Sequence, residues 1–173
     1  MMKEPHKVMT ETAAKLVEAI QQATSQYFRL AILVGAPTSG KTVLLRSLAQ
    51  QFAYPLLNVN LELSQRLLDL TYAQRSQYVD RLFKDVITAV TGDVVLLDNL
   101  EILFDPHLEI EPLRLLQMVS RNRTIVASWS GRFQGGALIY AEPGHPEFVQ
   151  FKQIEAVVIP VAATASRSGA YSS

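Results

Sequence analysis

Two patterns of apolar residues alternate along this chain. Continuous apolar runs occupy residues 30–34 and 94–97, and mostly apolar segments cover 124–128 and 54–59, the latter with Pro55 near its start. Runs of this length are typical of strands that are buried on both faces, as in a parallel sheet. Proline is tolerated at the start of a strand. These four segments therefore predict the central strands of an α/β domain.

Between these strands, apolar residues recur at helical spacing and predict covering helices. We expect Thr10 or Thr12 to cap the first helix and Asn60 to cap a later one. The expected helices cover about residues 10–27, 40–49, 61–70, 74–90 and 112–120. Strands that alternate with helices indicate a three-layer α/β/α domain with right-handed crossovers and a mostly parallel sheet.

The last part of the chain has shorter apolar segments and more turn residues. We expect, in chain order, a turn-rich stretch at 131–136, a strand at 137–141, and short strands or sheet edges at 148–151 and 156–161. Residues 163–173 are small and polar, which is typical of a disordered segment. The length favours one domain over residues 1–162, with no room for a separate lid domain.

A glycine-rich segment joins the first apolar strand to the helix that follows. Residues 35–42 read Gly-Ala-Pro-Thr-Ser-Gly-Lys-Thr and match the phosphate-binding P-loop pattern G-x-x-x-x-G-K-[ST]. Backbone N–H groups of the turn and the start of the helix form a nest for a phosphate anion. We expect Lys41 to reach the β- and γ-phosphates of ATP, and the Thr42 hydroxyl to bind Mg²⁺. The predicted nucleotide-binding residues are Gly35, Ala36, Pro37, Thr38, Ser39, Gly40, Lys41, Thr42 and Val43.

An acidic residue ends the apolar strand at 94–97. Asp98 would lie at the carboxyl end of this strand, where open α/β sheets bind ligands. A P-loop site needs such a carboxylate to hold Mg²⁺ through water, so Thr42 and Asp98 are the predicted metal residues. The alternative is that Asp98 only caps a helix. The extra strand at 54–59 predicts the additional-strand type of P-loop NTPase, with an AAA+-like core.

Hydrolysis would need a further group that orients or deprotonates water. Many P-loop ATPases carry a Glu directly after the Asp of this strand. This chain has Asn99 there and Glu101 two residues later. Glu101 is the better candidate base, because the amide of Asn99 can only position water. The alternative is that Glu101 is an ordinary solvated loop residue.

Small polar residues follow the strand at 124–128. In additional-strand ATPases a residue at this strand tip senses the γ-phosphate by hydrogen bonding, and either Ser128 or Ser130 fits that role. A capped strand end would explain the same residues. Trp129 is the only tryptophan, and we expect it in the core rather than beside adenine or at an exposed contact.

Arg121 and Arg123 lie between the helix at 112–120 and this strand. A single arginine near the end of a helix often only interacts with the helix dipole. Two guanidinium groups also suit phosphate recognition, because each can donate two parallel hydrogen bonds. In an oligomer either arginine could enter the site of a neighbouring subunit as an arginine finger. A contact with the DNA backbone is the remaining alternative.

Composition narrows the classes of function. The chain has 16 basic and 16 acidic residues, so no overall charge drives nucleic-acid binding, although a local basic face can exist. It has no cysteine, which excludes disulfides and thiolate metal sites, and its three histidines have no metal-binding spacing. No apolar run approaches the roughly 18 residues of a membrane span, and we expect a cytoplasmic protein without membrane contact.

Four stretches outside the P-loop have a distinctive sequence. They are Val-Asn-Leu-Glu-Leu-Ser at 59–64, Gly-Asp-Val-Val-Leu-Leu-Asp-Asn-Leu-Glu-Ile-Leu-Phe-Asp-Pro at 92–106, Ser-Arg-Asn-Arg-Thr at 120–124, and Tyr-Ala-Glu-Pro-Gly-His-Pro-Glu at 140–147. Over about residues 28–160 the chain thereby resembles BrxF, the family of small P-loop proteins of type 3 BREX phage-defence systems. The resemblance implies an ATPase-like subunit that works with a large ATPase, a DNA methyltransferase, a PglZ-type protein and a helicase.

The leading functional hypothesis is a homo-oligomeric ATPase that acts on phage DNA directly or through partners. A nucleotide-gated adaptor that binds ATP with negligible turnover is the second, and Asn99 favours it. A small-molecule or nucleotide kinase is the third, but its lid would have to draw on Arg66, Arg75 and Arg81 alone. ATP is expected rather than GTP, because no Asn-Lys-x-Asp stretch is present to read guanine.

The Pro/Gly loop at 140–147 supports a separate hypothesis. It holds two acids, Glu142 and Glu147, together with His145. These residues suit an interaction loop or part of an oligomer interface. The alternative is a tight structural connection between edge strands.

Overall fold

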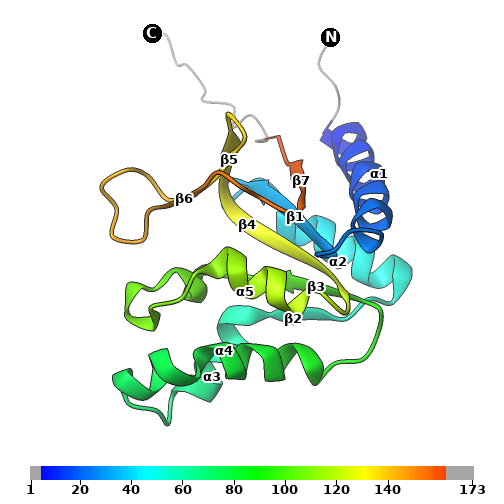
Figure 1. Cartoon of the computed structure of the whole chain (residues 1–173). Coiled ribbons are helices and arrows are strands. Elements are labelled where there is room, and N and C mark those ends of the chain that lie inside the picture. The colour runs from blue at the N-terminus through cyan, green and yellow to red at the C-terminus, as the bar shows by residue number, and fades with distance from the viewer. Residues whose placement is uncertain (1–4, 163–173) are drawn as a thin grey trace, which may run out of the picture.

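A computed structural model describes residues 5–162, with side chains from residue 9 onward. The helices are α1 (Pro5–Thr24), α2 (Lys41–Phe52), α3 (Val59–Leu67), α4 (Tyr72–Thr88) and α5 (Pro112–Val119), with 3-10 helices η1 (Glu101–Phe104) and η2 (Pro106–Leu108). The strands are β1 (Leu30–Gly35), β2 (Leu56–Asn58), β3 (Val94–Asp98), β4 (Thr124–Gln134), β5 (Ala137–Tyr140), β6 (Val149–Phe151) and β7 (Val157–Pro160). Helices α1 and α2 cover one face of the sheet, and α3, α4 and α5 cover the other (Figure 1).

The central sheet is parallel in the order β2-β3-β4-β1-β7. Strand β4 lies between the P-loop strand β1 and the strand β3 that carries Asp98. The predicted α/β class, the parallel sheet and the arrangement with an additional strand are therefore confirmed. The additional strand is β4, however, and not the segment at 54–59 that was expected in this role: that segment forms β2, which pairs with β3 at the edge of the sheet. Because parallel strands all end at the same edge, the carboxyl ends of β1, β3 and β4 meet in one place.

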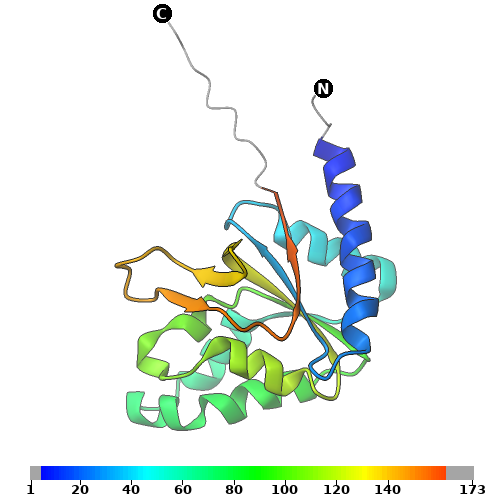
Figure 2. The same ribbon diagram turned by 45° about the horizontal axis from the view of Figure 1, so that its top comes forward.

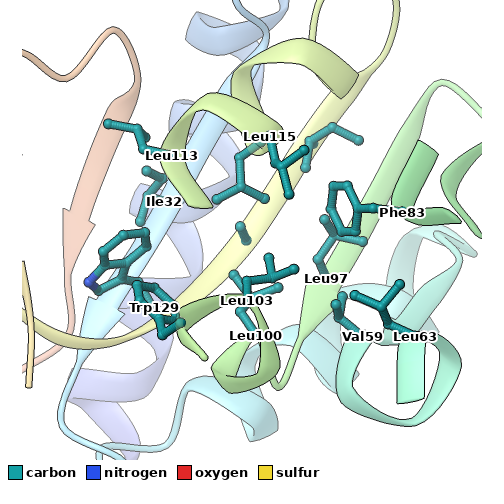
Figure 3. Packing of buried hydrophobic residues seen from close by; sticks show 14 of the residues in the cluster. Ile32, Val59, Leu63, Phe83, Leu97, Leu100, Leu103, Leu113, Leu115 and Trp129 are labelled. Atoms are coloured by element: carbon teal, nitrogen blue, oxygen red, sulfur yellow. The ribbon is translucent and has the colours of Figure 1, made fainter. Parts of the chain in front are cut away.

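Alternate residues of β1 enter the two layers of the core, as the strand period of two requires. Leu30, Ile32 and Val34 pack with α3, α4 and α5, in the core shown in part in Figure 3. Ala31 and Leu33 pack with α1 and α2 on the other face. Both faces of the strand are covered, which explains its continuous apolar sequence.

Trp129 is confirmed as a core residue, because its side chain is only 1% exposed. Its indole N–H donates a 3.1 Å hydrogen bond to the carbonyl oxygen of Ile139, which satisfies its polar atom. Phe104 packs edge-on against the indole ring. The tryptophan thus links β4 to β5 and to the 3-10 helix η1.

Strand β4 is longer than its sequence indicates, because it continues to Gln134 and pairs with β5 in an antiparallel hairpin. The expected turn-rich stretch at 131–136 is therefore mostly strand, and only Gly135 and Gly136 form the turn, both with positive φ. Gly131 permits this hairpin, since a Cβ there would collide with the carbonyl oxygen of Ile139. Strand β7 forms an edge of the main sheet beside β1, as expected.

Several expected helix boundaries need correction. Helix α1 begins at Pro5, so Thr10 and Thr12 lie inside it and do not cap it. Asn58, not Asn60, caps α3, because its side chain accepts a 3.1 Å hydrogen bond from the N–H of Leu61. The expected disorder of 163–173 concerns residues outside the described part of the chain.

Candidate nucleotide-binding site

The P-loop connects the buried strand β1 to the N-terminus of α2 at the carboxyl edge of the sheet. Gly40 precedes α2 with φ 93°, in the left-handed region that favours glycine. The first N–H groups of the helix have no partner within the helix, and they face the loop together with the positive end of its dipole. The backbone here is therefore shaped for an anion.

Lys41 lies inside the loop and is only 5% exposed. Its Nζ donates hydrogen bonds to the carbonyl oxygens of Gly35 at 2.9 Å and Ala36 at 2.6 Å. Burial lowers the pKa of Lys41, and the charges of Asp98 and Glu101 partly offset that effect. A phosphate beside the ammonium would favour its charged form in the same way.

Asp98 joins the P-loop to the sheet through both of its carboxylate oxygens. Its Oδ2 accepts a 2.7 Å hydrogen bond from the hydroxyl of Thr42, and its Oδ1 accepts a 2.6 Å bond from the hydroxyl of Ser128. The carboxylate is 6% exposed. A hydroxyl and a carboxylate at this separation are oxygen ligands of the kind that Mg²⁺ accepts, usually with several waters retained. The two residues predicted to hold the metal are thus side by side.

Glu101 begins η1 directly beyond Asp98 and is held on both carboxylate oxygens. Asn60 donates to Oε2 at 3.2 Å, and Ser130 donates to Oε1 at 3.4 Å. The Asn60 side chain also accepts a 2.7 Å bond from the N–H of Ile102. Glu101 thereby lies beside the P-loop, where it lines a cleft with Ala36 and Pro37, on the same edge of the sheet as Asp98.

The sequence analysis assigned Asn60 to a helix cap and missed this contact. The available signal was its position just after β2, whose carboxyl end lies at the same sheet edge. Asn99 has a positive φ of 55°, and its carbonyl oxygen accepts a 2.9 Å bond from the N–H of Asn60. The backbone of Asn99 therefore shapes the connection between β3 and η1.

Ser128 and Ser130 each contact a carboxylate of the candidate site, so the structure does not choose between the two serines that the sequence offered. They are two residues apart on β4, so their side chains leave the strand on the same side. Ser128 bonds Asp98, and Ser130 bonds Glu101. Each serine thus orients a different carboxylate.

A cleft of about 580 Å³ opens beside the P-loop. Ala36, Pro37 and Glu101 form one wall, and the β4–β5 hairpin with the loop after β5 forms the other. Arg132 of the hairpin contacts Glu142 of that loop at 2.9 and 3.1 Å. The sequence analysis did not identify Arg132, because the turn expected at 131–136 concealed its place on a strand.

The two arginines proposed as fingers lie before β4, at the edge of the sheet opposite the P-loop. The Arg123 guanidinium donates to the carbonyl oxygens of Gly92 at 2.9 Å and Ile87 at 2.8 Å, and so holds the end of α4. Arg121 is exposed, and its guanidinium lies 5.0 Å from the centre of the Tyr27 ring. Neither arginine reaches the P-loop of its own chain.

Comparison with known proteins places this geometry in context. Residues 31–111 match the family model described as "ATPase family associated with various cellular activities (AAA)". That segment runs from the P-loop strand through Asp98 and Glu101. No curated protein matches the sequence. No helix among residues 5–162 is long and apolar enough to cross a membrane.

Solved structures with related folds include PCH-2 of C. elegans, with 18% identity over 92% of this chain and 44% of that one, at a TM-score of 0.47. A DNA replication initiation factor has 16% identity over 93% and 47% of the two chains, at a TM-score of 0.48. AMPPCP-bound DnaA from Aquifex aeolicus has 15% identity over 94% and 48%, at a TM-score of 0.44. This chain spans less than half the length of each. Over residues 31–111 the chain is therefore similar to the AAA family of ATPases, and its parallel-sheet α/β fold is consistent with a P-loop NTPase.

Proposed function

We propose that this protein binds ATP with Mg²⁺ in the P-loop and hydrolyses it. The observation that carries the proposal is the hydrogen bond from Thr42 to Asp98, because it joins the two halves of a P-loop site across β4. The loop backbone and the start of α2 would hold the phosphates. Lys41 would exchange its bonds to loop carbonyls for the β- and γ-phosphate oxygens.

Thr42 and Asp98 would hold the magnesium ion, which supplies positive charge beside the phosphates when it is bound. Glu101 would accept a proton from the attacking water or orient it. Asn60 and Ser130 would position that carboxylate, and Ser128 would position Asp98. Each proposed catalytic group is therefore fixed by a neighbour from another element, as preorganised sites require.

We further propose that the protein acts as a homo-oligomer in which Arg121 of one subunit approaches the γ-phosphate bound by the next. Arg121 supports this role better than Arg123, because the Arg123 guanidinium already holds the end of α4. The sequence resemblance to the BrxF family supports a place in a bacterial anti-phage system of the BREX type. In that setting the ATPase cycle would control partners that act on DNA in the cytoplasm.

A nucleotide-gated adaptor is the alternative function. Both Glu101 oxygens already accept hydrogen bonds, and Asn99 occupies the position where many P-loop ATPases carry a Glu. A carboxylate held in this way can fail to reach the attacking water. The protein would then bind ATP tightly and dock a partner without turnover.

Measured ATP turnover decides between these functions. The rate per subunit is determined over a series of protein concentrations, with Lys41→Ala as the control. Turnover above the control supports the ATPase, and a per-subunit rate that rises with concentration supports sites completed by a neighbour. Tight ATP binding without turnover would reject Glu101 as a base and leave the adaptor.

A further inference from the structure

Strand β4 carries a row of polar side chains that leads away from the metal-binding carboxylate. Ser128, Ser130 and Arg132 are spaced two residues apart, so the alternation of a strand directs them to the same side. The row begins at Ser128, which bonds the buried Asp98, and it ends at Arg132, which lines the cleft beside Ala36 and Pro37. One continuous strand thus connects the Mg²⁺ end of the site to the hairpin.

Each member of this row contacts a carboxylate. Ser128 bonds Asp98, Ser130 bonds Glu101, and Arg132 makes a two-oxygen contact with Glu142. The first two carboxylates belong to the proposed catalytic site. The third belongs to the loop after β5, which projects from the sheet with β6 (Figure 2). The proposed function has no role for the third pair.

The ion pair between Arg132 and Glu142 is solvent-exposed and can be replaced by another contact of Arg132. The side chains are 44% and 74% exposed, and ion pairs with this exposure contribute little to stability. Arg132 and the P-loop residues Ala36 and Pro37 line the same cleft as Glu101. A second anion that entered this cleft would therefore compete with Glu142 for the guanidinium.

We propose that Arg132 contacts the terminal phosphate of ATP bound to its own chain, and that its ion pair with Glu142 breaks when this contact forms. This inference rests on the proposed function, since it needs ATP in the P-loop. Arg132 lies only about 7 Å along the strand from Ser130, which the length of an arginine side chain can span. The planar guanidinium matches two phosphate oxygens as well as it matches a carboxylate. ADP lacks the phosphate that Arg132 would contact.

The conformation of the β4–β5 hairpin and of the loop after β5 would therefore depend on which nucleotide is bound. Contact with ATP would draw Arg132 toward the P-loop and release Glu142, whose loop also holds His145 and Glu147. With ADP the Arg132–Glu142 pair would persist. Arg132 would thus contact the nucleotide of its own subunit and distinguish ATP from ADP, separately from any arginine that a neighbouring subunit supplies.

Calorimetric titration of the full chain with Mg²⁺ and either ADP or a non-hydrolysable ATP analogue tests this inference. The variants are Arg132→Ala, Arg132→Lys and Glu142→Gln. The matched control is Arg81→Ala, an exposed arginine of α4. Lys41→Ala checks that binding takes place in the P-loop. Because Glu142→Gln removes only an exposed carboxylate, it still tests the inference if Arg132→Ala folds poorly.

We expect Arg132→Ala to lower the affinity for the ATP analogue about tenfold, because a charged hydrogen-bond donor to the terminal phosphate is lost. The affinity for ADP should change less than about twofold. Arg132→Lys should lose most of that discrimination, since lysine cannot donate two parallel bonds. Glu142→Gln should raise the affinity for the ATP analogue about two- to fivefold, because it removes the carboxylate that competes with the phosphate for Arg132.

Equal losses for both nucleotides in Arg132→Ala, or weaker analogue binding in Glu142→Gln, would overturn the assignment of Arg132. If wild-type protein bound neither nucleotide, the proposed function itself would be wrong, and this inference with it. Normal ADP binding in every Arg132 variant separates the two failures.

Discussion

Replacement of Asp98 by asparagine tests the metal half of the site most directly. The side chain keeps its shape, and the hydroxyls of Thr42 and Ser128 can each rotate to donate or accept. A buried negative charge is removed, together with two charge-assisted hydrogen bonds. We therefore expect the free energy of unfolding without nucleotide to change by no more than about 2 kcal/mol.

Nucleotide binding should respond far more strongly to this substitution. A ligand at 100 times its dissociation constant stabilises the folded state by about 2.7 kcal/mol. For a domain of this size each kcal/mol raises Tm by roughly 2–4 °C, so Mg-ATP should raise the wild-type Tm by about 5–11 °C. In Asp98→Asn the part of this increase that depends on Mg²⁺ should disappear, because asparagine offers the ion no charge.

The assay is thermal unfolding with ATP in the presence of Mg²⁺ or of a chelator. Asp69→Asn, at an exposed position between α3 and α4, is the matched control and should behave as wild type. A full Mg²⁺-dependent increase in Tm in Asp98→Asn would refute the assignment of the metal residue. A collapse of stability without any ligand would show that Asp98 is mainly structural.

Three further predictions follow from other parts of the structure. Gly131→Ala should lower the free energy of unfolding by about 1–3 kcal/mol in urea denaturation, because its Cβ would meet the carbonyl oxygen of Ile139. His145→Ala combined with Glu147→Ala should disturb oligomer assembly in sedimentation analysis while the monomer Tm stays unchanged, and normal assembly would reject the loop as an interface. ATP affinity should decrease as pH rises, and this decrease should begin at a lower pH than the ordinary pKa of lysine would give. The reason is that burial lowers the pKa of Lys41, and its ammonium charge is lost as pH rises through that pKa. An affinity that stays flat up to pH 10 would contradict this last prediction.

Local sequence determined the P-loop, the central strands and the approximate place of Asp98. The turn chemistry of Gly40 is local, and so is the burial pattern that marks β1 and β3. The order of strands and helices then brought Asp98 to the carboxyl edge of a parallel sheet. These features depend on neighbours within a few residues, so periodicity and spacing were enough to predict them.

The tertiary structure alone decided which polar groups meet around the site. Asn60 reaches Glu101 across 41 positions of sequence, and Ser128 reaches Asp98 across 30. Whether Arg123 is free or holds the end of α4 also depends on a contact between distant segments. Such contacts follow from strand register and from how the helices pack on the sheet, and a shift of one residue would turn each side chain to the other face. The sequence therefore determined that the P-loop and Asp98 lie at this edge, whereas the packing of β4 against β1 and β3 decided how the carboxylates of the candidate site are held.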